Sequence, residues 1–141
     1  MKAKLNDIIL VNTSFNRETS LEFEDDFELD TQIDINHGFS SENNFVVQFS
    51  YKMKLDIKNN DELVPQFEYS STHVAQFETK ENEENDPVKI ERFANINVAA
   101  MIFPFIRENV ATISAKAGMS PIMIPVINFI ELYERNKNKL K

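Results

Sequence analysis

The chain has 141 residues and contains no cysteine, no tryptophan and only two glycines. Without cysteine it has no disulfide, no thiolate metal site and no cysteine nucleophile, as is usual for proteins of a reducing compartment. Two glycines are too few for a glycine-rich phosphate loop. The G-x-S-x-G turn that many serine hydrolases use is also missing.

The side chains that most often carry catalysis or bind metals are equally scarce. The two histidines are His37, next to Gly38 in a predicted turn, and His73, in the middle of a predicted strand. Neither has the neighbouring His or Cys that a metal site requires. Adjacent acids such as Asp25 and Asp26 lie in a charge run and are weak candidates for an acid and base pair. We therefore expect no enzyme, no metal site and no cofactor.

The formal net charge is −8, from 23 acidic and 15 basic residues. A negative chain repels phosphate backbones, so we expect no nucleic-acid partner. The acidic residues concentrate in two stretches, which are either solvated loops or a docking face for a basic partner. These stretches contain Glu22, Glu24, Asp25, Asp26, Glu28 and Asp30, and then Glu78, Glu81, Glu83, Glu84 and Asp86.

No targeting or membrane segment is expected. The stretch 1–7 is polar, and the apolar run 8–11 is too short for the hydrophobic part of a signal peptide. No run reaches the roughly 18 apolar residues that a membrane span needs. A cytoplasmic protein that does not insert into membranes is the expectation.

The length suits a single domain over residues 1–141. Alternation of apolar and polar residues predicts four strands, at 7–15, 27–36, 45–58 and 66–77. The strand at 45–58 has the strongest pattern, because every second residue from Phe45 to Ile57 is apolar. A shift of one residue would expose that whole set to water, which fixes the register.

The second half of the chain predicts helices. After an acidic loop at 78–86, Asp86 and Pro87 form a helix start. Pro104 lies inside the pattern of the long helix, which must kink or begin anew there. Gly118 ends that helix, an apolar lid loop with two prolines follows, and Asn128 caps the last helix. The apolar stripe of the long helix comprises Val98, Met101, Ile102, Phe105, Ile106, Val110 and Ile113.

Together these segments predict an α+β fold. We expect a four-stranded antiparallel sheet with a long kinked helix and a short C-terminal helix on one face. The strands occupy about residues 7–77, and the helices and lid loop occupy 87–138. Met101, Phe103 and Phe105 make the apolar arc of the long helix wider than one contact needs, which indicates a second partner surface.

Two motifs resemble those of SecB, a family of export chaperones. That family carries a pattern like ILFPYARE, then a glycine and a short apolar loop with proline, then APVNFDALF. Here residues 101–108 read MIFPFIRE, Gly118 follows, and residues 124–133 read IPVINFIELY. The similarity extends through most of the chain, but only this third is specific.

The resemblance implies an ATP-independent holdase that keeps unfolded or precursor proteins competent for Sec-dependent export. It also implies a homotetramer, built as a dimer of dimers. The implied client-binding residues are apolar and comprise Phe23, Phe27, Phe103, Phe105, Met119, Ile122, Met123 and Ile124. The implied subunit interface comprises Phe67, Tyr69, Met101 and Ile102.

The chain departs from the family where its members dock the translocation motor SecA. An Asp-Ile-Ser-Phe-Glu motif supplies two carboxylates in the family, and Asn12 and Asn16 stand at those positions here. Glu68 is the remaining candidate for partner docking. Two alternatives therefore stay open: a solitary SecB-like chaperone that protects an antitoxin, and a carrier of a small apolar ligand.

Overall fold

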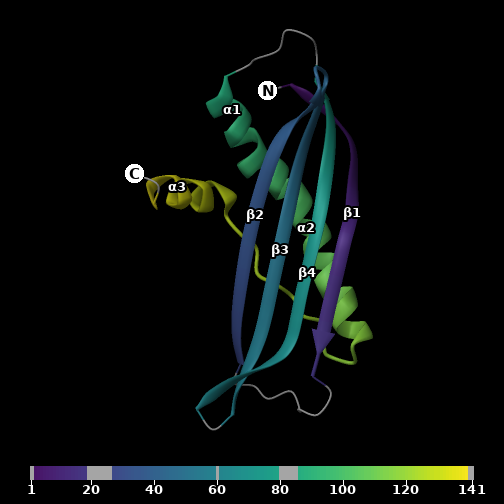
Figure 1. The fold of residues 1–141 in the computed structure, drawn as a ribbon, viewed down its shortest axis with the longest axis vertical. Coiled ribbons are helices and arrows are strands. Elements are labelled where there is room, and N and C mark those ends of the chain that lie inside the picture. The colour runs from purple at the N-terminus through teal and green to yellow at the C-terminus, as the bar shows by residue number, and fades with distance from the viewer. Residues whose placement is uncertain (1, 19–26, 60, 80–85, 140–141) are drawn as a thin grey trace.

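The computed structural model describes residues 2–18, 27–59, 61–79 and 86–139. Four long strands form one antiparallel sheet in the order β1-β4-β3-β2, so β1 and β2 lie at its two edges (Figure 1). The strands are β1 (Ala3–Arg17), β2 (Phe27–Ser41), β3 (Asn44–Asn59) and β4 (Glu62–Thr79). The helices are α1 (Pro87–Arg92), the π-helical η1 (Phe93–Val98), α2 (Ala99–Lys116) and α3 (Phe129–Lys139). The predicted fold class is confirmed.

The strands are longer than predicted, and this corrects one position. His37 and Gly38 lie within β2, paired with Val47 and Val46 of β3, rather than in a turn. The hydrogen-bonded pairing of β2 with β3 continues through both residues. Pairing with β3, whose register is fixed by its buried face, outweighs the weak strand preference of the His-Gly pair. Phe39 then packs on Phe45 at a ring distance of 5.1 Å.

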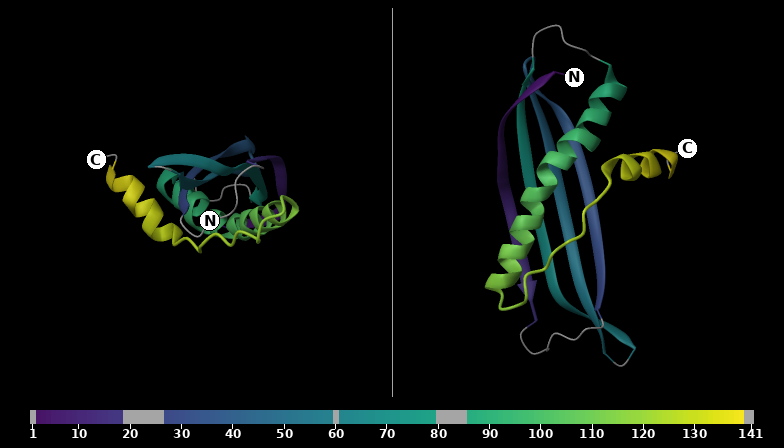
Figure 2. Two further views of the ribbon diagram at one scale, coloured as in Figure 1. Left: turned by 90° about the horizontal axis from the view of Figure 1, so that it is seen from below. Right: turned by 180° about the vertical axis from the view of Figure 1, so that it is seen from behind.

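One face of the sheet forms the core. The odd-numbered residues of β3 from Phe45 to Ile57 are all at most 4% exposed and point toward the helices. This confirms the predicted register, and we call this side the helix face. The opposite side, here called the open face, carries the alternate residues, such as Lys52 and Lys54. All the described helices lie on the other side of the sheet from the open face (Figure 2).

The segments α1, η1 and α2 run on as one 30-residue helix that crosses the helix face diagonally (Figure 2). Pro104 lies inside α2, so the helix does not begin anew there. The departure from α geometry lies before it, in η1, where wider turns adjust the path of the helix. The residues buried on the sheet are Ala94, Val98, Ala99, Ile102, Phe103, Ile106, Val110 and Ile113.

This helix is also long and apolar enough to cross a membrane, with a mean hydropathy of 1.2 over its best window. No such segment was predicted from the sequence. Core helices often have this length and composition, and the stripe buried against the sheet gives this helix a place in the core.

The helix ends follow the sequence signals. Asp86 accepts a hydrogen bond from the Val88 N–H at 3.0 Å, with Pro87 in the first turn. Gly118 has a φ of 77°, and the N–H groups of Gly118 and Met119 bond back to Ala115 and Ser114. That pair of bonds is the Schellman motif, which requires the left-handed residue that glycine supplies. Asn128 caps α3 through bonds from Ile130 and Glu131.

A buried histidine lies between β4 and α2. His73 is 3% exposed, and its Nδ1 atom has no hydrogen-bond partner among the described residues. Burial lowers the pKa of His73 below the usual 6.5, and the Glu108 carboxylate partly opposes this. The folded chain therefore favours neutral His73, since a charged imidazole would lose hydration that the Glu108 carboxylate replaces only in part.

His73 should make stability depend on pH. Above about pH 6.5 histidine is neutral in both folded and unfolded chains and contributes no dependence. Below it, the unfolded chain takes up the proton first, so the free energy of unfolding should fall until the pH reaches the lower folded pKa. Urea unfolding of the wild type and His73→Leu, at one protein concentration, measures this. Parallel pH curves for the two proteins would contradict the prediction.

Candidate functional site

The lid loop, residues 119–128, joins α2 to α3 across the helix face. It runs from the end of the sheet near β1 to the edge at β2, where α3 projects beyond the sheet (Figure 2). Within the described part of the chain, residues 120–127 make no backbone–backbone hydrogen bond. The loop is therefore an extended segment that side chains hold in place.

Three side-chain hydrogen bonds fix the loop and the turn before it. The Ser114 hydroxyl accepts a bond from the Ile122 N–H at 2.9 Å. The Arg107 Nε donates to the Ile124 carbonyl at 2.9 Å. The Arg17 guanidinium donates to the Ala117 carbonyl and so connects the end of β1 to the end of α2. Two of these three bonds act on the lid loop itself.

The side chains of the lid loop divide between the core and the surface. Ile124 is 1% exposed and Met119 8%, and both belong to the core. Met123 is 69% exposed and Val126 77%. Ile122 and Ile127, both half-buried, pack against the core from its edge. The inward side chains are therefore two or three residues apart along the loop.

The predicted client-binding residues do not form one surface patch. Phe103, at 4% exposure, is packed between Phe49 and Phe129. Phe27 and Phe105 are each 49% exposed, but they lie on β2 and α2 respectively. Phe23 lies outside the described residues. Client binding by these residues remains a prediction.

The apolar row on β2 is a further candidate, of which only Phe27 was among the residues predicted to bind clients. Phe27, Leu29 and Phe39 are between 38% and 49% exposed on the helix face, and Ile33 and Ile35 are half-buried. We call these five residues the β2 strip. The alternation that predicted this strand was visible in the sequence. Its position at the edge, beyond the cover of α2, was not.

A cavity of about 200 Å³ lies where β2 meets α1 and α3. Ile33 and Ile35 of the β2 strip form one wall, and Leu132 and Tyr133 of α3 form another. The Tyr133 ring has the Arg92 guanidinium 5.5 Å from its centroid and the Lys137 ammonium 5.8 Å away. The Lys137 contact lies within α3, whereas the Arg92 contact joins α3 to α1 and so keeps α3 beside the β2 edge.

The predicted interface residues fall into two groups. Phe67, Tyr69 and Ile102 are each at most 3% exposed and belong to the core of one protomer. Met101 is 42% exposed on α2. The neighbouring edge strand β1 has further exposed apolar residues, and with Met101 and Phe105 we call them the β1 surface. They are Leu5, Leu10, Val11 and Phe15, at 41% to 61% exposure.

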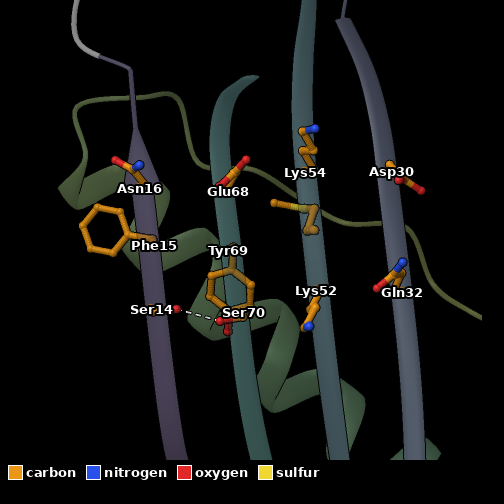
Figure 3. Close-up of a pocket in the computed structure, with 11 residues that line it drawn as sticks. Ser14, Phe15, Asn16, Asp30, Gln32, Lys52, Lys54, Glu68, Tyr69 and Ser70 are labelled. Carbon is orange, nitrogen blue, oxygen red and sulfur yellow. Dashed lines mark hydrogen bonds between the residues drawn. The ribbon is translucent and has the colours of Figure 1, made fainter. Parts of the chain in front are cut away.

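The open face has a shallow hollow of about 520 Å³ that contains the predicted docking residue (Figure 3). Glu68 lies between Asn16 of β1 and Lys54 of β3, and Asp30 of β2 follows in the same row. Among the described residues Glu68 makes no ion pair (Figure 3). Its carboxylate and the Lys54 ammonium are thus both available to a partner.

The chain matches a family model described as preprotein translocase subunit SecB over residues 3–140. The chain is 30% identical to the protein-export protein SecB of Anaplasma phagocytophilum over 90 residues. The aligned stretch covers 64% of this chain and 57% of that protein. The chain thus spans little more than half the length of that relative. The protein-export protein SecB of Rickettsia felis is 26% identical over 142 residues, with 93% of this chain and 89% of that protein covered.

A solved structure has the same fold. It is the SecB-like chaperone of Mycobacterium tuberculosis in complex with a ChAD peptide from the HigA1 antitoxin. The two structures superpose with a TM-score of 0.74 at 16% sequence identity, over 89% of this chain and 90% of the other.

Because Glu68 has no ion-pair partner among the described residues, its replacement should leave stability unchanged. We expect Glu68→Gln to alter the free energy of unfolding by less than about 0.5 kcal/mol, the usual range for surface positions. Chemical denaturation measures this, with Asp56→Asn at the 7% exposed Asp56 as a contrasting buried site on the same sheet. A loss above about 1 kcal/mol for Glu68→Gln would show that this carboxylate has a structural partner.

Proposed function

The chain belongs to the SecB family, and on that premise we propose that it is a cytoplasmic, ATP-independent holdase chaperone. It binds unfolded or precursor polypeptides and keeps them competent for Sec-dependent export. Binding rests on apolar contact and backbone hydrogen bonds, and no nucleotide or cofactor takes part.

The observation that carries the proposal is the β2 strip beside a free strand edge. Phe27, Leu29 and Phe39 expose apolar surface next to unpaired backbone groups of β2. An extended polypeptide can add to such an edge through main-chain bonds and place alternate side chains on the strip. Main-chain bonding is independent of sequence, which suits a chaperone with many clients.

Assembly uses the other edge. The β1 surface combines an unpaired edge strand with exposed apolar residues of β1 and α2. Such an edge pairs with other chains unless it is covered, and pairing with a second copy removes that hazard. We propose that two such dimers form the homotetramer. Several linked client sites would then hold one unfolded chain more tightly than any single site.

Delivery to SecA is the weaker part of the proposal. Asn12 and Asn16 lack the carboxylates that the docking motif of the family supplies, and Lys54 adjoins Glu68. Each of these features reduces the attraction of the open face for a basic segment. We expect any contact with SecA through Glu68 to be weak.

A second candidate function is the protection of an antitoxin. It is favoured by the same two amides, and by the structural relative, which was solved with an antitoxin peptide. Both functions use the same client site and differ in the client. A carrier of small apolar ligands has no such support, because Phe49, Phe103 and Phe129 fill the space between helix and sheet with ring centroids 5.5 to 6.3 Å apart.

Met123→Asp should weaken client holding and leave assembly intact. Met123 is 69% exposed on the lid loop, so a charge there is tolerated by the fold. It would remove apolar contact with a client, and we expect affinity for an unfolded protein to fall about tenfold. Suppression of the aggregation of a denatured client, together with fluorescence titration, measures this.

The matched control is Gln48→Glu, which adds the same charge at an exposed position of the open face. That variant should hold clients as the wild type does. Equal affinity of Met123→Asp and wild type would exclude the lid loop from the client site.

Native mass spectrometry should show a tetramer at four times 16.4 kDa. Leu10→Lys places a charge on the β1 surface and should yield smaller species. Leu29→Lys on the β2 strip should stay tetrameric and lose client affinity instead. If Leu29→Lys alone dissociated the tetramer, assembly would use the β2 edge and the assignment proposed here would be wrong.

A further inference from the structure

We propose that the lid loop is an internal mimic of the client. In the free protein it occupies part of the client site, and a client binds by displacing it. This inference rests on the proposed function and deepens it, since the sequence of the loop then describes the segments that bind best.

The composition of the loop supports this reading. Residues 119–127, MSPIMIPVI, comprise six Met, Ile or Val residues, two prolines, one serine and no charge. An ordinary surface connection is rich in polar residues and does not contribute to the core. Here Ile124 is as deeply buried as the core residues of β3, and Met119 is 8% exposed. The loop thus has the properties of an extended apolar polypeptide bound across the sheet.

The way the loop is held also supports it. Residues 120–127 make no backbone–backbone hydrogen bond in the described part of the chain, and their backbone is tied only by Ser114 and Arg107. Segments with few such bonds open at small free-energy cost compared with unfolding of the whole domain. Gly118 at one end and the Asn128 cap at the other mark where the movement would begin and end.

The location connects the loop to the β2 strip. The loop ends at α3 beside the β2 edge (Figure 2). Displacement would uncover the core residues that Ile124 now covers, and a client along β2 could then extend beneath α3. The favoured client segment is extended, uncharged and aliphatic, with apolar side chains two or three residues apart, as in the loop itself. It tolerates proline, since the loop itself contains Pro121 and Pro125.

The first test releases the loop. Ser114→Ala with Arg107→Met removes both hydrogen bonds while keeping the size of each side chain similar. If the loop competes with the client, affinity for an unfolded client should rise about tenfold, because each bond lost favours the displaced state about threefold or more. Thr112→Ala, which removes an exposed hydroxyl bound to Glu108 on the same helix, is the control and should change nothing.

Unchanged or weaker client binding by the double variant would overturn the proposal, provided circular dichroism shows it folded. If the double variant does not fold, a measurement on the wild-type protein still tests the proposal. Hydrogen exchange at the Ile122 amide, which donates to the Ser114 hydroxyl in the free protein, should become faster when client is bound. Unchanged or slower exchange there, with client demonstrably bound, would also overturn it. A wild-type protein that binds no client at all would instead refute the proposed function.

The client class has its own test. A synthetic peptide with the sequence of residues 118–128 should compete with an unfolded client for the double variant. The same peptide with aspartate at the positions of Ile122 and Ile124 should compete at least tenfold less well. Equal competition by the two peptides, or competition by neither, would refute the aliphatic client class.

Discussion

The structure depends on a mismatch in width between one helix and the sheet it covers. Outer strands of a four-stranded sheet lie about 14 Å apart, whereas a helix is about 10 Å wide. The long helix crosses the sheet diagonally, so it protects the centre and leaves parts of β1 and β2 bare. Apolar residues nevertheless continue to both edges. One protomer therefore cannot bury all the apolar surface that its strands create.

The two bare edges differ in what surrounds them, and this difference suggests separate roles. The β1 edge adjoins the exposed side of α2, where Met101 and Phe105 lengthen the apolar surface into a broad area suited to a second copy. The β2 edge adjoins the end of the lid loop and α3, which packs on the rest of the protomer through Phe129 in the core and through the contact of Tyr133 with Arg92. A permanent partner requires a large rigid surface. A transient partner requires a binding surface whose covering segment, here the lid loop, can move away.

The sequence predicted the fold well because local patterns determine it. The alternation in β3, the cap at Asp86 and the left-handed Gly118 all act within a few residues and were read correctly. The outcome at Pro104 was less accessible, because α2 continues through the proline and the π-helical segment lies earlier, at η1. His37 was misplaced for a similar reason, since its partner on β3 lies outside its local sequence.

The candidate site was harder to predict, because exposure depends on strand order. Phe103 and Ile124 belong to motifs that the family resemblance emphasised, yet both are buried in the protomer. Leu29 and Phe39 belong to no motif and are exposed. Their strand β2 stays at an edge of the sheet, because β1 pairs with β4 rather than with β2. Sequence patterns show which residues are apolar, but the neighbours of each strand determine which of them remain uncovered.

The most direct test of this account is backbone hydrogen exchange resolved strand by strand, with and without an unfolded protein. We expect β1 to be protected in the free protein, because a second copy covers it, and β2 to gain protection only when the unfolded protein is added. Fast exchange of both edge strands under both conditions would contradict the account.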